Sequence, residues 1–353
     1  RVWSLSEAPW PPGPPAEWLD LIRLARPSFI PLLPHLNRTV AGVLRRHRAG
    51  SRRLRGFVDA QLMITAQAGA DETAWLYGAT ALDFARPGVF TVAGGIGAIA
   101  ECLAEALHRQ GGQVLFKRRV TAIRPAAGGY QVETARGEVH QARSVIANLS
   151  PADLAGLLDD PLRRRLPSRW RGREAPWGAA MAYLELDAAF IPPGFADHHQ
   201  ILCDYDEPIG EGNSVFFSLS PAWDTARAPA GLRVATLSTH TRARAWWQTA
   251  GREEYRERRA DYTERLIGAA ERALPSLRST IRRILPATPV TFHRFTRRAA
   301  GYVGGFPQTS LFDAIGPGTG LPNLYLVGDS TFPGQSTAAV TLGAERLVRR
   351  LLR

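Results

Sequence analysis

The residues best suited to chemistry lie near the carboxyl end, in the passage NLYLVGDSTFPGQSTAAVTLGAERL at 323–347. The pattern predicts a short buried strand, Asn323–Val327, that ends at Gly328 and Asp329. Open α/β sheets bind ligands at the carboxyl ends of their strands. Gly328 would let a phosphate or a sugar-like chain approach the backbone closely, and Asp329 could accept hydrogen bonds from hydroxyl groups.

The residues after this strand predict a turn and the start of a helix. Pro333-Gly334 sets the turn, and Ser336 or Thr337 is expected to cap a helix from about Ala338 to Leu352. The first N–H groups of a helix have no partner inside it and carry partial positive charge, so they stabilise negative charge on a ligand. Taken alone, this residue pattern is equally consistent with a strand, a turn and a capped helix that bind no ligand.

No catalytic acid, base or metal ligand is evident elsewhere. Four carboxylates occur in aromatic or apolar settings where burial could raise a pKa, although each also suits a helix cap or a loop: Asp71, Glu72, Asp204 and Asp206. Cys102 and Cys203 are far apart and have no Cys or His at metal-ligand spacing, so we expect no disulfide and no metal site. A reducing, cytoplasmic compartment is consistent with this cysteine usage.

The charge balance bears on the partners. The chain of 353 residues has a formal net charge of +12, 45% hydrophobic residues, and Lys117 as its only lysine. Its arginines are scattered or clustered between apolar segments, as in Arg45-Arg46-His47-Arg48, and no aromatic residues alternate with them. This argues against nucleic-acid binding and favours a basic face on an anionic membrane surface. No apolar run reaches the ~18 residues that a spanning helix needs.

The segment 92–150 has the clearest architecture. Gly94-Gly95-Ile96-Gly97 opens a predicted helix with an apolar face that Gly111-Gly112 ends. Strands are then expected at 113–116, 120–123, 130–134 and 138–147, the last of them including a buried strand at 144–147. A helix, a small meander and a buried strand are typical of the later part of a dinucleotide-binding fold.

The other segments predict a second, mixed body. Predicted helices lie at 16–26, 36–47, 54–81 (two helices joined at 69–71), 152–158 and 253–274, and predicted strands at 180–186, 214–220 and 233–239. We therefore expect four interleaved pieces: 1–91 and 151–319 form a substrate region, whereas 92–150 and 320–353 form a cofactor-binding domain.

Residues 301–343, which contain GYVGGFPQTSLFDAIGPGTG and the passage described first, resemble the flavin-binding C-terminal segment of bacterial carotenoid desaturases. These enzymes form the phytoene-desaturase branch of the amine-oxidase superfamily, and the C-3',4' desaturases of photosynthetic bacteria are the most similar subgroup. The similarity is specific at 301–343, moderate at 57–124 and superfamily-level at 151–290. It implies an α/β fold in which a Rossmann-like FAD-binding domain is interleaved with a mixed α+β substrate domain.

The resemblance also implies the cofactor and its site. Residues expected at FAD are Val120 (backbone, at the adenine), Gly328, Asp329, Ser330 and Gly334 (at the ribityl–pyrophosphate part), and Ser336, Thr337, Ala338 and Ala339 (at the isoalloxazine). Residues expected at the flavin face or the mouth of a polyene tunnel are Tyr302, Gly304, Gly305 and Phe306. The catalytic acid and base stay unassigned.

One departure from the family concerns its dinucleotide-binding loop. The family begins with a strand and a G-x-G-x-x-G turn that holds the pyrophosphate. This chain has no such motif, since Gly94-Gly95-x-Gly97 has a different spacing. We therefore expect the chain to be the C-terminal part of a longer flavoprotein.

The resemblance implies FAD-dependent desaturation of a carotenoid, with hydride transfer to flavin N5 and reoxidation by an external acceptor. Alternatives are a carotenoid isomerase that uses reduced flavin, a flavin amine oxidase, and a non-catalytic remnant of such an enzyme. We expect a cytoplasmic protein, peripheral to the inner face of the cell membrane, that binds a carotenoid and no nucleic acid. The oligomeric state stays open.

Overall fold

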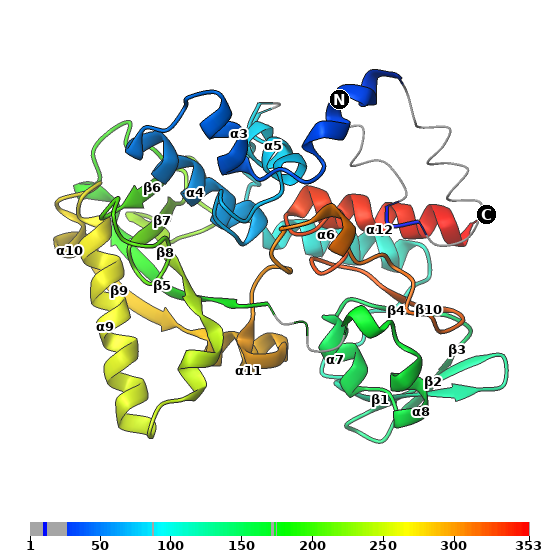
Figure 1. Ribbon diagram of the computed structural model, residues 1–353. Coiled ribbons are helices and arrows are strands. Elements are labelled where there is room, and N and C mark those ends of the chain that lie inside the picture. Colours follow the sequence, from blue (N-terminus) through cyan, green and yellow to red (C-terminus); the bar gives the residue numbers. More distant parts are fainter. Residues whose placement is uncertain (1–9, 13–26, 87, 171–172, 174, 353) are drawn as a thin grey trace. The chain divides into compact units, whose positions relative to one another are not determined.

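A computed structural model describes residues 10–12, 27–86, 88–170, 173 and 175–352 (Figure 1). The helix predicted at 16–26 lies outside these residues. The chain divides into two compact units: the first comprises Arg1–Phe84, Arg118–Pro176 and Val303–Arg353, and the second comprises Ala85–Lys117 and Trp177–Tyr302. Each unit is built from segments that are far apart in the sequence. Helices and sheets are both present, which confirms the mixed α/β class.

The first unit begins with a helical layer. Its elements are the 3-10 helix η1 (Pro27–His35), α3 (Val40–Arg46), α4 (Arg52–Ala66) and α5 (Trp75–Asp83). The Thr39 side chain accepts a hydrogen bond from Gly42 N at 3.1 Å and caps α3. The cap position of α5 is Ala74, without a side-chain hydrogen bond. Asp71, in the turn before it, pairs with Arg55 at 2.6 Å.

The first unit also contains two small sheets. The elements are the antiparallel meander β1 (Val120–Ala126), β2 (Gly129–Thr134) and β3 (Val139–Ala142), the parallel pair β4 (Val145–Ala147) and β10 (Leu324–Leu326), the helices α7 (Pro151–Gly156), α8 (Asp160–Arg165) and α12 (Thr337–Leu351), and the 3-10 helices η2 (Ser168–Trp170) and η6 (Leu311–Asp313). Leu324 is opposite Val145 in the parallel pair, so the strands predicted at 144–147 and 323–327 both form and share one sheet.

The predicted strand at 113–116 is wrong. These residues form no strand, and Leu115 and Phe116 are exposed. A strand persists only where a neighbouring strand satisfies its backbone groups, and within the described part of the chain no strand pairs with this segment.

The second unit is a five-stranded antiparallel sheet with helices. Its elements are α6 (Gly97–Arg109), β5 (Trp177–Asp187), β6 (His198–Leu202), β7 (Ser214–Leu219), β8 (Leu232–Arg242), α9 (Arg252–Ala270), α10 (Leu277–Thr280), β9 (Ile281–Ala287) and α11 (Pro289–Thr296), with short 3-10 helices η3 (Ala188–Phe190), η4 (Ala243–Trp247) and η5 (Ala299–Gly301). The strand order is β6-β7-β8-β5-β9.

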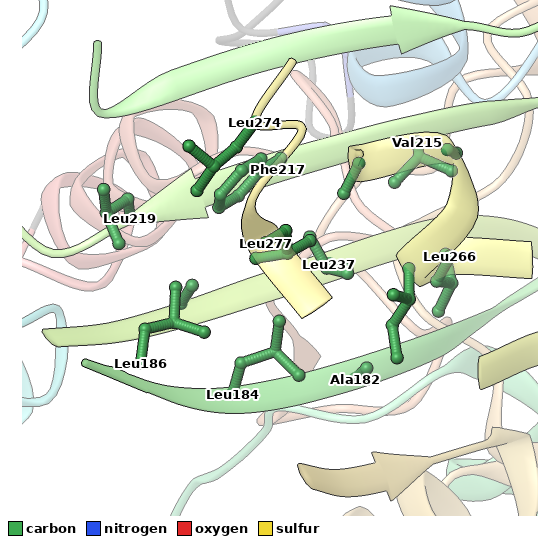
Figure 2. Packing of buried hydrophobic residues seen from close by; sticks show 14 of the residues in the cluster. Ala182, Leu184, Leu186, Val215, Phe217, Leu219, Leu237, Leu266, Leu274 and Leu277 are labelled. Atoms are coloured by element: carbon green, nitrogen blue, oxygen red, sulfur yellow. The ribbon is translucent and has the colours of Figure 1, made fainter. Parts of the chain in front are cut away.

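The core of this unit follows from strand alternation. In β5 the even-numbered residues Ala182, Leu184 and Leu186 point to one face, because successive side chains of a strand alternate. There they pack with Leu266 of α9 and with Phe217 of β7 (Figure 2). The opposite face of the sheet carries the odd-numbered residues of β5, which are less buried from Ala179 to Asp187.

His240 of β8 predicts a pH dependence of stability. Burial lowers the pKa of His240 to about 4. As the pH falls below about 6.5, the unfolded chain binds a proton at this histidine and the folded chain does not, so folding loses about 2–3 kcal/mol by pH 4. We expect His240→Asn to remove this part of the acid sensitivity, as measured by urea unfolding at pH 7 and pH 4.5. An equal loss in the wild type and the variant would contradict the assignment.

Candidate functional site

The carboxyl ends of the two parallel strands meet at Gly328. Val327 N donates to Ala147 O at 2.9 Å, which extends the pairing beyond β10. Gly328 has φ 111°, and a Cβ atom at this position would lie 2.4 Å from Oδ1 of Asn148, the residue that follows β4. The positive φ therefore favours glycine, and a larger residue would also have to displace the Asn148 side chain. Asp329 follows directly and is partly exposed.

A tight turn then leads into α12. Thr331 N and its hydroxyl both donate to Gly328 O, at 3.1 and 2.8 Å. Ser336 caps the helix, as predicted, by accepting from Ala339 N at 3.1 Å. Thr337 and Ala338, the first two helical residues, are exposed. Their N–H groups belong to the first turn, which lacks intrahelical acceptors, and they can donate to an acceptor on a bound molecule.

The Gly304-Gly305-Phe306 loop lies against this strand end. A Cβ atom on Gly305 would be 2.1 Å from Asp329 O, so the two backbones are in direct contact. Gly305 N donates to Gln335 Oε1 at 2.9 Å, and Gln335 Nε2 donates to Ile64 O at 2.8 Å. Gln335 thus links the loop to the last turn of α4.

Gln308 connects its loop to the end of α4, to the residue before α5 and to the turn at Pro333. Its backbone N donates to Ala66 O at 2.9 Å, and its backbone O accepts from Ala74 N at 3.0 Å. Its side-chain Nε2 donates to Pro333 O at 3.0 Å. The sequence reasoning missed both glutamines. Their only signal was their position inside the two informative passages, GGFPQ and PGQST.

A small pocket of about 30 Å³ opens beside the strand end. Its wall includes Phe306 and Asp329, together with Tyr77, Arg173 and Asp313. The pocket adds both polar and apolar surface beside the strand end.

Arg173 and Tyr77 are two of the polar residues that line this pocket. The Arg173 guanidinium lies 4.6 Å from the centroid of the Phe306 ring and donates to Asp313 O. Burial lowers the pKa of Arg173 and raises the pKa of the Tyr77 hydroxyl. Neither residue was predicted, because nothing in its local sequence distinguishes it from other arginines and tyrosines.

Two predicted site residues lie elsewhere. Val120 is the first residue of β1, paired with Thr134, and packs partly buried against the core that contains Leu324 and Leu326. Tyr302 belongs to the second unit, where its buried hydroxyl accepts from Arg244 Nε at 3.1 Å. The structure thus brings together Gly304, Gly305 and Phe306 with the segment 328–339.

Asp71 was one candidate for a raised pKa, and that hypothesis is wrong. The Arg55 guanidinium donates to its carboxylate at 2.6 Å, and this hydrogen bond lowers the pKa of Asp71. Asp71 stabilises the α4–α5 corner and is unsuited to holding a proton near neutral pH.

Comparison with known proteins identifies the family of this chain. Residues 29–352 match the family of flavin containing amine oxidoreductases, and the chain belongs to that family. Among solved structures, an oxidoreductase from Methanosarcina mazei superposes with a TM-score of 0.63 at 17% identity, over 91% of this chain and 71% of that one. Putrescine oxidase bound to putrescine superposes with a TM-score of 0.58 at 16% identity, over 93% and 70%. At these identities the structural likeness shows the fold alone.

The relatives found by sequence share a more specific name than the family, prolycopene isomerase. A chloroplastic prolycopene isomerase of Arabidopsis thaliana is 30% identical over 325 residues, which is 88% of this chain and 54% of the relative. The carrot enzyme of the same name, from Daucus carota, is 28% identical over 84% of this chain and 49% of its own length. The chain therefore spans about half the length of these relatives.

The family implies a flavin cofactor, and the residues at the strand end fit part of one. The Asp329 carboxylate is suited to accepting hydrogen bonds from ribityl hydroxyls, and the N–H groups of Thr337 and Ala338 are suited to donating to a ring carbonyl. Helix α12 has 15 residues, long enough for its N-terminal partial charge to contribute.

Proposed function

We propose that this protein is a flavin-dependent enzyme that isomerises double bonds in the polyene of a carotenoid. The observation that carries the proposal is the 30% identity to a prolycopene isomerase over 88% of the chain. The glycine-rich strand end and the α12 N-terminus supply a flavin site of the kind that this chemistry requires. Isomerisation needs no net oxidation, which is consistent with a site to which we assign no proton-transferring residue.

The cofactor we propose is FAD. Gly328 and Asp329, with Ser330 and Gly334 beside them, would hold its ribityl–pyrophosphate part, and the residues from Ser336 to Ala339 would face the ring. Val120 would present its backbone to the adenine. A bound flavin supplies reversible exchange of hydride or electrons with the polyene. The chain's own contribution is to orient the ring, through the α12 N–H groups, and to keep the loop at Gly305 against it.

Desaturation of a carotenoid is the second candidate. It is favoured by the resemblance of residues 301–343 to the flavin-binding segment of carotenoid desaturases. Phe306 and the adjacent glycines would line the polyene path in either reaction. The two reactions differ in electron balance. Desaturation removes two hydrogens from the substrate and needs an electron acceptor. Isomerisation removes no hydrogen and needs no acceptor.

The experiment that separates the two candidates is product analysis. The protein, supplied with FAD and a dinucleotide-binding segment, is incubated with a poly-cis carotenoid under reducing, oxygen-free conditions. An isomerase yields a product of unchanged mass and altered cis–trans geometry without an added acceptor. Product that forms only with an oxidising acceptor, and that has lost hydrogen, would replace the isomerase proposal by the desaturase. No change of a carotenoid under either condition would refute both.

We further propose that a dinucleotide-binding segment completes the parallel sheet of β4 and β10. Strands of parallel sheets are normally covered on both faces, yet Ile146 in β4 has 48% of its surface exposed. A βαβ unit at this position would cover Ile146 and supply the pyrophosphate-binding loop. The greater length of the relatives is consistent with such a segment.

We also propose a cytoplasmic protein at the inner face of the cell membrane. The support is the net charge of +12 together with a substrate that resides in the bilayer. None of the described helices is long and apolar enough to cross a membrane.

Asp329 offers a direct test of the flavin site. Asp329→Ala is expected to weaken FAD binding by about 1–3 kcal/mol, or about 5- to 150-fold, because ribityl hydroxyls lose a charged acceptor. The measurement is a flavin fluorescence titration of the protein completed with its dinucleotide-binding segment. Asp160→Ala, which removes an exposed carboxylate from α8, is the matched control. Equal affinities for the two variants would remove Asp329 from the site.

A further inference from the structure

The outward face of α4 carries apolar side chains that no described element covers. Leu54, Phe57 and Ile64 are 37%, 58% and 39% exposed. At 100° per residue these three positions fall within one 80° arc of the helix, with Gln61 between them. The opposite side of the helix, which includes Val58 and Leu62, packs in the core with α3 and α5 (Figure 1). The helix is therefore apolar on its buried side and on part of its exposed side.

The same end of the helical layer is rich in arginine. Arg46 and Arg48 lie at the end of α3 and in the turn before α4, and Arg53 lies in the first turn of α4; all three are exposed. Arg53 falls within 20° of Ile64 on the helical projection. In the described part of the chain these three arginines form no ion pair.

Two nearby carboxylates already pair with other arginines. Asp59 pairs with Arg55 at 2.6 Å, and Asp71 pairs with Arg55 and Arg45 at 2.6 and 3.4 Å. The exposed arc of α4 itself contains no carboxylate, since Asp59 lies on its inner side and is largely buried. The surface thus presents apolar side chains next to unneutralised positive charge.

We infer that the outward face of α4, with Arg46, Arg48 and Arg53, is a docking surface for an anionic phospholipid bilayer. Phe57, Leu54 and Ile64 would enter the boundary between headgroups and acyl chains, and the arginines would contact lipid phosphates. An amphipathic helix parallel to the membrane binds in this way, through buried apolar area plus electrostatic attraction. A soluble protein partner with a matching apolar groove would not account for the positive charge, whereas an anionic membrane accounts for both properties. The inference rests on the membrane attachment proposed above and names the surface responsible.

The test is co-sedimentation with carotenoid-free vesicles made of phosphatidylcholine alone or of equal parts phosphatidylcholine and phosphatidylglycerol. The full chain should bind the anionic vesicles, and less at high salt. The triple variant Arg46→Ser, Arg48→Ser, Arg53→Ser should bind them at least about tenfold more weakly, and Phe57→Ser about fivefold more weakly.

Two control variants match these changes. Arg136→Ser, Arg143→Ser, Arg252→Ser removes the same charge from exposed positions elsewhere, and Phe295→Ser removes an aromatic side chain that is 77% exposed on α11. Both controls should bind like the wild type, and thermal unfolding should show that every variant folds. If controls and α4 variants lost binding equally, or if Phe57→Ser changed the oligomeric state and left vesicle binding intact, the inference would be wrong. Because the vesicles contain no substrate, this outcome is independent of the catalytic proposal.

Discussion

Gly305→Ala is expected to destabilise the folded chain by at least about 3 kcal/mol, because a methyl group there has no room. The new Cβ atom would lie 2.1 Å from the backbone oxygen of Asp329. A backbone oxygen cannot move aside as the end of a flexible side chain can. The loop must therefore shift away from the strand end, which also breaks the hydrogen bond from Gly305 N to Gln335. Urea unfolding measures the change in the free energy of unfolding.

The control is Gly156→Ala, at the end of α7, where an added Cβ would meet no atom within 4 Å. This variant should differ from the wild type by less than about 1 kcal/mol. In protein supplied with flavin, Gly305→Ala should also weaken flavin binding, since it displaces the loop from Asp329. A Gly305→Ala variant as stable as Gly156→Ala would show that the contact between the loop and the strand end is not formed.

The predictions from sequence were most accurate where local patterns determine the structure. The turn at Pro333-Gly334, the cap at Ser336 and helix α12 were predicted because turn and capping preferences act over a few residues. The two strands of the parallel pair were also predicted, at 144–147 and 323–327, from their apolar character.

The interactions that organise the site were not predictable in the same way. Gln335 contacts Ile64, which is 271 positions away, and Arg173 reaches Asp313 across 140 positions. Such contacts depend on how the elements pack, and a single sequence does not encode them in any local pattern. The misassigned strand at 113–116 has the same origin, because strand formation depends on a partner that is distant in the sequence.

The second large effect is expected at Glu211, in the loop before β7. Its Oε1 accepts from Arg242 N at 2.7 Å, and its Oε2 accepts from the Thr241 hydroxyl at 2.8 Å and from the Tyr262 hydroxyl. Thr241 in turn accepts from Trp246 Nε1 at 3.0 Å. Thr241, Tyr262 and Trp246 are buried, so the Glu211 carboxylate is the acceptor for two buried hydroxyl groups.

Glu211→Ala should therefore cost about 3–5 kcal/mol of stability, because buried hydroxyl donors lose a charged acceptor. Urea unfolding of this variant is compared with that of Glu207→Ala, which removes an exposed carboxylate from the same loop and should change stability by less than about 1 kcal/mol.

Tyr262 provides a second readout. Burial first, and then the hydrogen bond to Glu211, raise the pKa of its hydroxyl. Without Glu211, Tyr262 should ionise at lower pH in a tyrosinate absorbance titration of the folded protein. Unchanged stability together with an unchanged Tyr262 titration would mean that Glu211 does not hold this network.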